Sequence, residues 1–235
     1  MESGKSLLLV SPEYEGVTPS WFSPGFWGGQ AKPVTSGGRG GAWFIDAEPA
    51  NLVLRHYRRG GLMAKLAEKT YLFSSFERAR SLAEFRLLVK LRSLGLTVPE
   101  PIAAIVWKYR VFWYQAAIVV KRIPGAVTFA DSPSLGDEDV WRKLGQVTRQ
   151  FHDQGLDHVD LNCDNVLVTG DQVYLIDFDR CRLVTESVTG TNATWKQGNL
   201  NRLHRSIEKR CTSLTSEQRR TYWDILLQAY GHSQR

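Results

Sequence analysis

The chain has 235 residues, 43% of them hydrophobic, and its 30 Lys and Arg residues outnumber 24 Asp and Glu residues, which gives a formal net charge of +6. This apolar content suffices for the core of one domain or of two small lobes. The tightest apolar clusters, Leu7–Val10 and Ala116–Val120, are far shorter than the roughly 20 residues that cross a bilayer, and no basic segment leads into a long apolar stretch, so neither a membrane-spanning helix nor a secretory signal is expected.

The cysteines bear on the compartment and on metal binding. Cys163, Cys181 and Cys211 are odd in number, and no two of them are spaced as C-x-x-C. This usage argues against a disulfide framework and against a zinc site. We therefore expect reduced thiols in a cytoplasmic protein.

The first part of the chain predicts an antiparallel sheet with one helix. Residues 11–41 combine four prolines with many glycines and aromatic side chains, so we expect an irregular loop that packs by its aromatic residues. Apolar positions recur at helical spacing from Phe76 to Leu94, and Gly95 ends that helix. The strand-like runs before and after it are Ala42–Ile45, Asn51–His56, Ile102–Trp107 and Phe112–Val120.

The pattern breaks at Ile123-Pro124-Gly125, which is the predicted hinge. Strands dominate before this point and helices after it. The sequence therefore predicts an α+β protein with an N-lobe at residues 1–122, a C-lobe at residues 123–235 and a cleft at the hinge.

Beyond the hinge the period changes. Apolar residues mark one face of a helix over Val140–Phe151, and the chain from about residue 196 onward has helical character. Between them, the short strands Val166–Val168 and Val173–Ile176 are joined by a turn at Gly170-Asp171. This hairpin is expected to bring the loops at its two ends together.

Polar residues cluster in those loops. His158, Asp160 and Asn165 precede the first strand of the hairpin, and Asp177-Phe178 follows the second. Phosphoryl transfer requires a carboxylate that accepts or orients the proton of the attacking hydroxyl, and hard oxygen ligands for Mg²⁺. Asp160 can supply the first group, and Asn165 and Asp177 the second. Their order and spacing match the H-x-D-x-x-x-x-N and D-F-x arrangement of protein kinases and their relatives.

A single carboxylate on a loop is usually a cap or turn residue. Here three residues of suitable type coincide with the flanking strands and the preceding helix, which favours a kinase-like site. We therefore predict a two-lobed protein-kinase-like fold: an N-lobe with an antiparallel sheet plus one helix and a mostly helical C-lobe, which together form one kinase-like domain. ATP and Mg²⁺ are the expected cofactors, with Asp160 as the catalytic residue and Asn165 and Asp177 as metal ligands.

A kinase-like N-lobe also needs a nucleotide clamp: a glycine-rich loop over the phosphates, a cation on a strand and a helix glutamate that holds this cation. Gly37, Gly38 and Gly40 precede a predicted strand, but the third glycine of G-x-G-x-x-G is missing, so a plain hairpin turn is the alternative. Arg55 stands where a strand lysine is usual and can bind phosphate as a planar fork. Glu84 borders the apolar stripe of the helix and is the expected partner; a simple surface charge is the alternative.

Several runs of the sequence resemble the Kdo kinases of Gram-negative bacteria, a lipopolysaccharide-kinase group within the protein-kinase-like superfamily. These runs are Phe26–Gly29, Leu52–Gly61, His158–Asn162, Leu175–Arg180 and Asn201–Ser206. The resemblance implies phosphorylation of the 4-hydroxyl of 3-deoxy-D-manno-octulosonic acid (Kdo) on lipid A precursor by ATP, at the cytoplasmic face of the inner membrane. It places Asp160 in catalysis and Asn165 and Asp177 on the metal.

Departures from ordinary protein kinases disfavour a protein substrate. Asn162 stands where the catalytic-loop lysine is usual, Asp179 replaces the glycine after D-F, and no A-P-E follows. Two alternatives to a Kdo kinase stay open: another small-molecule kinase of this fold, of heptose or aminoglycoside type, and a catalytically inactive nucleotide- or lipid-binding module.

The basic excess is local. Residues 55–92 contain ten Lys and Arg residues and three Glu residues. Such a segment attracts phosphates and anionic lipid head groups, although a solvated helix face is an equally ordinary explanation. We expect a peripheral protein on an anionic membrane surface, with Kdo-lipid A precursor as its substrate, no nucleic acid and no evident protein partner.

Overall fold

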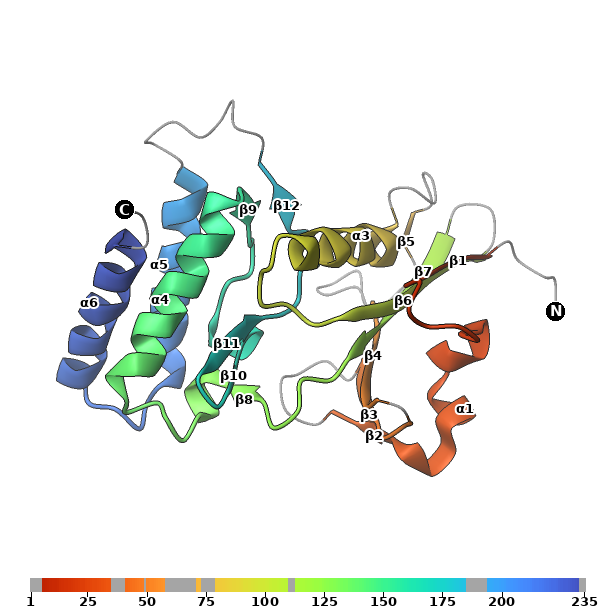
Figure 1. Cartoon of the computed structure of the whole chain (residues 1–235), viewed down its shortest axis with the longest axis horizontal. Helices are drawn as coiled ribbons and strands as arrows, with labels where there is room; N and C mark the ends of the chain where they lie inside the picture. The colour runs from red at the N-terminus through yellow and green to blue at the C-terminus, as the bar shows by residue number, and fades with distance from the viewer. Residues whose placement is uncertain are drawn as a thin grey trace. The chain divides into compact units, whose positions relative to one another are not determined.

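The computed structural model describes residues 6–34, 41–48, 50–57, 71–72, 79–109, 113–184 and 194–232. Its contacts divide the chain into two compact units (Figure 1): the first comprises Met1–Lys90 and Pro99–Arg122, and the second Leu91–Val98 and Ile123–Arg235. The first holds an antiparallel sheet and the second most of the helices, so the α+β class is confirmed. The predicted lobe boundary and cleft stay predictions.

Unit 1 is built on a seven-stranded antiparallel sheet with the order β1-β6-β7-β4-β3-β2, in which β5 also pairs with β7. Four of its strands were predicted from their apolar runs. The strands are β1 (Ser6–Val10), β2 (Ala31–Pro33), β3 (Ala42–Ile45), β4 (Leu52–His56), β5 (Tyr71–Leu72), β6 (Pro101–Tyr109) and β7 (Trp113–Lys121).

The N-terminal segment covers one face of this sheet. Phe22 is buried in a cluster with sheet residues such as Leu54 and Ile105, and Trp21 and Trp27 pack against it. The predicted packing by aromatic residues is confirmed, but the predicted irregular loop is wrong in part: the segment forms short helical turns, because proline at the first helical position favours a helix start. These turns are η1 (Pro19–Phe22), α1 (Pro24–Trp27) and η2 (Gly28–Gln30).

Helix α3 (Arg80–Ser93) is the helix expected between the second and third predicted strands. Leu82 and Leu88 are buried on its apolar stripe, and the Ser81 hydroxyl donates to the carbonyl of Ile105 at 2.8 Å. The predicted start at Phe76 lies outside the described residues.

Unit 2 is mainly helical, and Figure 1 shows its three long helices side by side. They are α4 (Glu138–Asp153), α5 (Thr194–Arg210) and α6 (Ser216–His232). Asp137 caps α4 by accepting from the Asp139 N–H at 3.0 Å. The contact of α4 with α6 is very close at Gly145, where a Cβ atom would collide with the carbonyl of Leu226.

The predicted hairpin follows α4 along the chain as β10 (Val166–Thr169) and β11 (Gln172–Leu175), and β8 (Val127–Thr128) pairs with the free edge of β10. Gly170, at the turn, has φ +56°, a conformation that glycine adopts without strain. The remaining elements of unit 2 are β9 (Leu156–Asp157), which pairs with β12 (Arg182–Leu183), and the single turns η4 (Phe129–Asp131) and η5 (Cys163–Asn165).

Among the described residues, no helix combines the length and the apolar character that crossing a membrane requires. Cys163, Cys181 and Cys211 are free cysteines in the structure.

Candidate active site

The loop between β9 and β10, called the catalytic loop here, comprises residues 158–165 and is closed by one side chain. Asn162 donates from its amide nitrogen to the carbonyl of Asp160 at 2.9 Å. Its amide oxygen accepts from the backbone N–H groups of Asp164 at 2.9 Å and Asn165 at 3.2 Å. Asn162 lies where ordinary protein kinases have the catalytic-loop lysine. In this chain the residue at that position therefore holds the loop together by hydrogen bonds and supplies no charge.

Asp160 and Asn165, predicted to act together, are joined directly. The amide nitrogen of Asn165 donates to the carbonyl of Asp160 at 2.9 Å, which fixes the plane of the amide. The Asp160 side chain is exposed. The bond thus leaves the Asp160 carboxylate facing solvent and holds the Asn165 side chain, whose oxygen is a hard ligand, next to it.

Asp177 is tied to both ends of the same loop through the preceding residue. The N–H of Ile176 donates to the carbonyl of Asn165 at 3.0 Å, and the carbonyl of Ile176 bonds with Nε2 of His158 at 3.0 Å. Asp177 itself has φ +61°, a left-handed conformation that is uncommon for a non-glycine residue and recurs at active sites. The structure therefore brings Asp160, Asn165 and Asp177 into one site within unit 2.

His158 supports the backbone of this site from the buried side. Its side chain is buried and lies 5.2 Å from the ring of Phe178, measured between ring centroids. Burial lowers the pKa of His158, so the ring is neutral and its Nε2–H donates to Ile176. His158 positions the backbone around Asp177 and does not carry charge to the reaction.

Helix α5 anchors the catalytic loop at three points. The side chain of Asn199 accepts from the His158 N–H at 2.9 Å and donates to the buried carboxylate of Asp157 at 3.0 Å. Ser206 accepts from the Cys163 N–H at 2.9 Å. At the end of the helix, Arg210 donates to the Asp164 carboxylate at 2.9 Å.

These anchors were missed by the reasoning from sequence. Asn199 is a buried polar residue on a helix, and no motif or spacing distinguishes it from a solvent-facing asparagine. The one available signal was Asp157, which directly precedes the H-x-D motif and is held from its other side by Arg182 at 3.2 Å.

Unit 1 contains the predicted pair of Arg55 and Glu84. The guanidinium of Arg55 donates to the Glu84 carboxylate, and the hydroxyl of Tyr57 donates to the same oxygen. Glu84 is only 5% exposed. The alternative that Glu84 is a simple surface charge is therefore excluded, and Tyr57 is a further member of the cluster that the sequence did not reveal.

Strand alternation explains why Arg55 and its neighbour have different tasks. Successive side chains of a strand point to opposite faces of the sheet. Arg55 points toward α3, whereas the ring of His56 bonds with the carbonyl of Phe22 at 2.7 Å on the face that the N-terminal segment covers.

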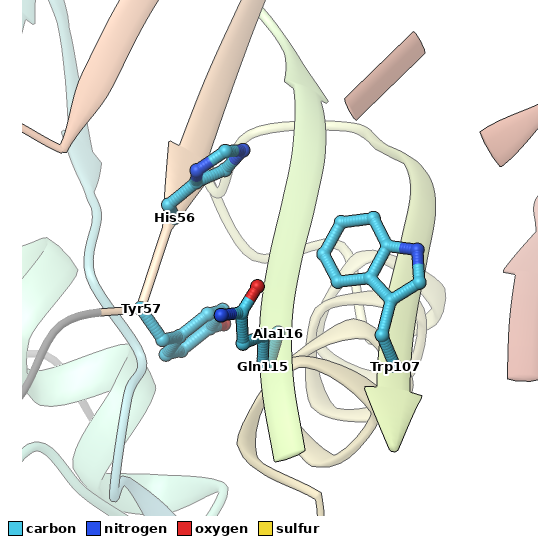
Figure 2. A pocket seen from close by; sticks show the side chains of 5 residues that line it. All are labelled: His56, Tyr57, Trp107, Gln115 and Ala116. Carbon is cyan, nitrogen blue, oxygen red and sulfur yellow. The ribbon is translucent and has the colours of Figure 1, made fainter. Parts of the chain in front are cut away.

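A hollow of about 320 Å³ lies at the end of β4 (Figure 2), lined by His56, Tyr57, Trp107, Gln115 and Ala116. The ring of His56 bonds with the carbonyl of Phe22 and contacts Trp107 edge to face, so both interactions hold this ring in the packing of the sheet. We assign no chemistry to this hollow.

Gly37, Gly38 and Gly40, the predicted phosphate loop, lie outside the described residues, as do Arg58 and Arg59 of the basic segment. The first described residue after the glycines is Gly41, whose carbonyl accepts from the His56 N–H at 2.7 Å. The loop remains a prediction.

The donor set of the site suits Mg²⁺. Within the ranges that the structure describes, no group of three or more His, Cys, Asp and Glu side chains could hold a metal by itself. Asn165 and Asp177 offer two hard oxygen ligands, and Mg²⁺ in kinases takes its other ligands from phosphates and water. These residues therefore fit an ion that arrives with a nucleotide.

Comparison with known proteins agrees with this chemistry. The model of a family described as "Lipopolysaccharide kinase (Kdo/WaaP) family" matches residues 25–230. A 3-deoxy-D-manno-octulosonic acid kinase of Stenotrophomonas maltophilia (strain K279a) is 46% identical over 191 residues, which are 80% of this chain and 74% of that protein. The enzyme of the same description from Xylella fastidiosa (strain M12) is 43% identical over 206 residues, 87% of this chain and 80% of that protein.

Solved structures show the same fold at low identity. WaaP in complex with acyl carrier protein gives a TM-score of 0.58 at 14% identity and covers 96% of this chain and 88% of that chain. The Rio2 kinase complex with ADP/Mg²⁺-phosphoaspartate from Chaetomium thermophilum gives 0.51 at 18% identity, over 86% of this chain and 67% of that chain. These likenesses confirm the predicted protein-kinase-like fold.

Proposed function

Because the chain belongs to the lipopolysaccharide kinase (Kdo/WaaP) family, we propose that it transfers the γ-phosphoryl group of ATP to the 4-hydroxyl of Kdo on Kdo-lipid A precursor, in synthesis of the lipopolysaccharide inner core. One observation carries this chemistry: hydrogen bonds connect the backbone and side chains around Asp160, Asn165 and Asp177, so the three residues lie in one site. Identity of 41–46% to several Kdo kinases over most of the chain favours this acceptor over heptose or an aminoglycoside.

Asp160 would orient the attacking hydroxyl and accept its proton. Its carboxylate is exposed, while its own carbonyl accepts from two asparagine side chains that fix the backbone beneath it. Phosphoryl transfer depends mainly on positioning and on electrostatic stabilisation, so a carboxylate held on a fixed loop is the group that the acceptor needs.

Asn165 and Asp177 would hold Mg²⁺. The ion supplies positive charge to the phosphate oxygens when it is bound. The two residues reach their places independently of any ligand, because Asn165 is bonded to Asp160 and the residue before Asp177 is bonded to both His158 and Asn165.

Arg55 would contact the phosphates of the nucleotide, held in place by Glu84 and Tyr57. A guanidinium is always charged and offers several N–H donors in a plane, so it can replace the usual lysine while still pairing with Glu84. The intact set of Asp160, Asn165 and Asp177 argues against an inactive module.

The acceptor lies in a membrane, so we further propose that the protein acts at the cytoplasmic face of the inner membrane as a peripheral protein. The support is the net charge of +6 together with the basic segment 55–92. Lys and Arg residues near an anionic surface each contribute about 1 kcal/mol to binding.

The test is incubation of the protein with radiolabelled ATP, Mg²⁺ and a lipid A precursor that carries one Kdo. We expect one labelled lipid product, with the phosphate assigned to the 4-hydroxyl by NMR. Parallel reactions with a heptose acceptor and with an aminoglycoside distinguish the related kinases. Nucleotide binding without transfer to any acceptor would identify an inactive module.

A further inference from the structure

Helix α5 presents one row of residues to the catalytic loop. Asn199, Ser206 and Arg210 contact residues 157–158, 163 and 164. At about 100° per residue, these three positions fall within an arc of roughly 40° on the helix. The loop that carries Asp160 and the helix thus form one fixed assembly.

A second row lies beside the first. Arg202, Arg205 and Lys209 are spaced i, i+3, i+7, which places them together on a flank roughly 60–120° from Asn199. The opposite side of the helix faces α6, because Glu208 pairs with Arg219 at 3.0 Å and His204 lies 4.5 Å from the ring of Trp223. The basic row therefore lies on a flank of the helix, between the face bonded to the catalytic loop and the face that contacts α6.

This flank is open and its charges are not neutralised. Arg205 and Lys209 are exposed. Within the described part of the chain, no carboxylate lies within ion-pair distance of Arg202, Arg205 or Lys209. A Cβ atom added at Gly198, one turn before Arg202, would meet nothing within 4 Å. Arg205 and Lys209 thus face solvent, and Arg202 is half-buried beside them.

Arg202 also has an unmet hydrogen bond. Its Nε–H is shielded from solvent, and no described residue offers it an acceptor. Buried donors without acceptors are rare in folded proteins, and each one requires an explanation. The unpaired donor of Arg202, in a row of cations, points to an acceptor that binds there.

We propose that the row of Arg202, Arg205 and Lys209 binds an anionic group of the acceptor, with the guanidinium of Arg202 in direct contact. This inference rests on the proposed function, since Kdo is an acid and lipid A precursor carries phosphates. Arginine binds carboxylate and phosphate alike through paired N–H donors. Because α5 is bonded to the catalytic loop, an anion held on this row would fix the acceptor relative to Asp160.

The test uses Arg202→Gln and Arg202→Lys in the full chain, with Arg220→Gln as the matched control. Arg220 is exposed on α6, outside the row. We expect Arg202→Gln to raise the KM for Kdo-lipid A precursor about 10- to 100-fold, the size expected for loss of a hydrogen bond to a charged group. Arg202→Lys should restore part of this loss, because it keeps the charge without the planar fork. Arg220→Gln should behave like the wild type.

The KM for ATP and the thermal midpoint should not change in Arg202→Gln, because the Nε–H of Arg202 has no hydrogen-bond partner, and its guanidinium no ion-pair partner, in the described part of the chain. An unchanged KM for the acceptor would overturn the proposal. So would a fall in kcat and in thermal midpoint together, which would make Arg202 a structural residue.

Two further arms identify the anion and separate this inference from the proposed function. If the variant's defect persists with an acceptor whose lipid A phosphates have been removed, Arg202 binds the Kdo carboxylate; if it disappears, Arg202 binds a phosphate. Should the wild type fail to phosphorylate Kdo-lipid A precursor at all, the proposed function fails. In that case titration calorimetry with Kdo and with inorganic phosphate decides this inference: weaker binding by Arg202→Gln than by Arg220→Gln supports it, and equal binding overturns it.

Discussion

Asn199→Ala tests whether α5 determines the position of the catalytic loop. The substitution removes the acceptor of the His158 N–H and a donor to the Asp157 carboxylate, both of them buried. A buried donor left without a partner costs about 1–3 kcal/mol, and loss of a hydrogen bond to a charged group about 1.5–3 kcal/mol. Arg182 still contacts Asp157 at 3.2 Å, so the lower part of the second range applies. We expect a loss of about 3–4 kcal/mol, a large share of the 5–15 kcal/mol of a typical domain.

The loss is measured by urea denaturation, with Asn201→Ala as the control. Asn201 is exposed on the same helix and bonds only with Gln197, at 2.8 Å, among the described residues, so its replacement should cost less than about 0.5 kcal/mol. Turnover of Asn199→Ala should fall as well, since a displacement of about 1 Å at a catalytic group can cost 100-fold. Equal stability of the two variants, or a destabilised Asn199→Ala with normal turnover, would refute the reasoning.

Four further outcomes are expected. Asp160→Asn should keep the fold and ATP binding but lose most phosphoryl transfer, because we propose that its exposed side chain acts on the acceptor; turnover like that of the wild type would remove Asp160 from catalysis. Asp177→Gly, which is compatible with φ +61°, should keep stability and weaken nucleotide binding only when Mg²⁺ is present, as titration calorimetry with and without the ion would show. Burial lowers the pKa of His152 from 6.5 to about 4. Because the unfolded chain then takes up a proton at higher pH than the folded chain, the free energy of unfolding should fall as the pH decreases from 6.5 to about 4, and buried His158 contributes in the same direction. His152→Gln should reduce the dependence of this free energy on pH, as a series of denaturation curves at different pH would show. Replacing Arg58 and Arg59 by Ser should reduce co-sedimentation with anionic vesicles at low salt, and binding that ignores both salt and lipid charge would exclude an electrostatic origin.

The catalytic loop could be predicted because its signal is local. Asp160 and Asn165 are five positions apart, and Asp177 is connected to them by a hairpin whose turn is marked by Gly170. Short-range spacing and turn chemistry are legible in one sequence, so the three residues, the strands around them and the fold class followed from it.

The parts that escaped prediction depend on contacts between distant positions. Asn199 bonds with a residue 41 positions earlier, and nothing in its own neighbourhood indicates burial. Strand β1 was visible only as the apolar cluster Leu7–Val10, because its partner β6 comes about a hundred positions later, where Leu8 pairs with Ile105. The bond of Tyr57 to Glu84 was missed for the same reason, because the two residues are 27 positions apart.

The many hydrogen bonds of the catalytic loop have a consequence for substrate binding. The backbone N–H groups of His158, Cys163, Asp164 and Asn165 all donate to side chains within unit 2. Ordering a flexible loop of this length would oppose ligand association by several kcal/mol of conformational entropy. In this protein that entropy is lost when the chain folds, so the site is preorganised: its amides should exchange hydrogen slowly even without ligand, and the acceptor meets a carboxylate already in position.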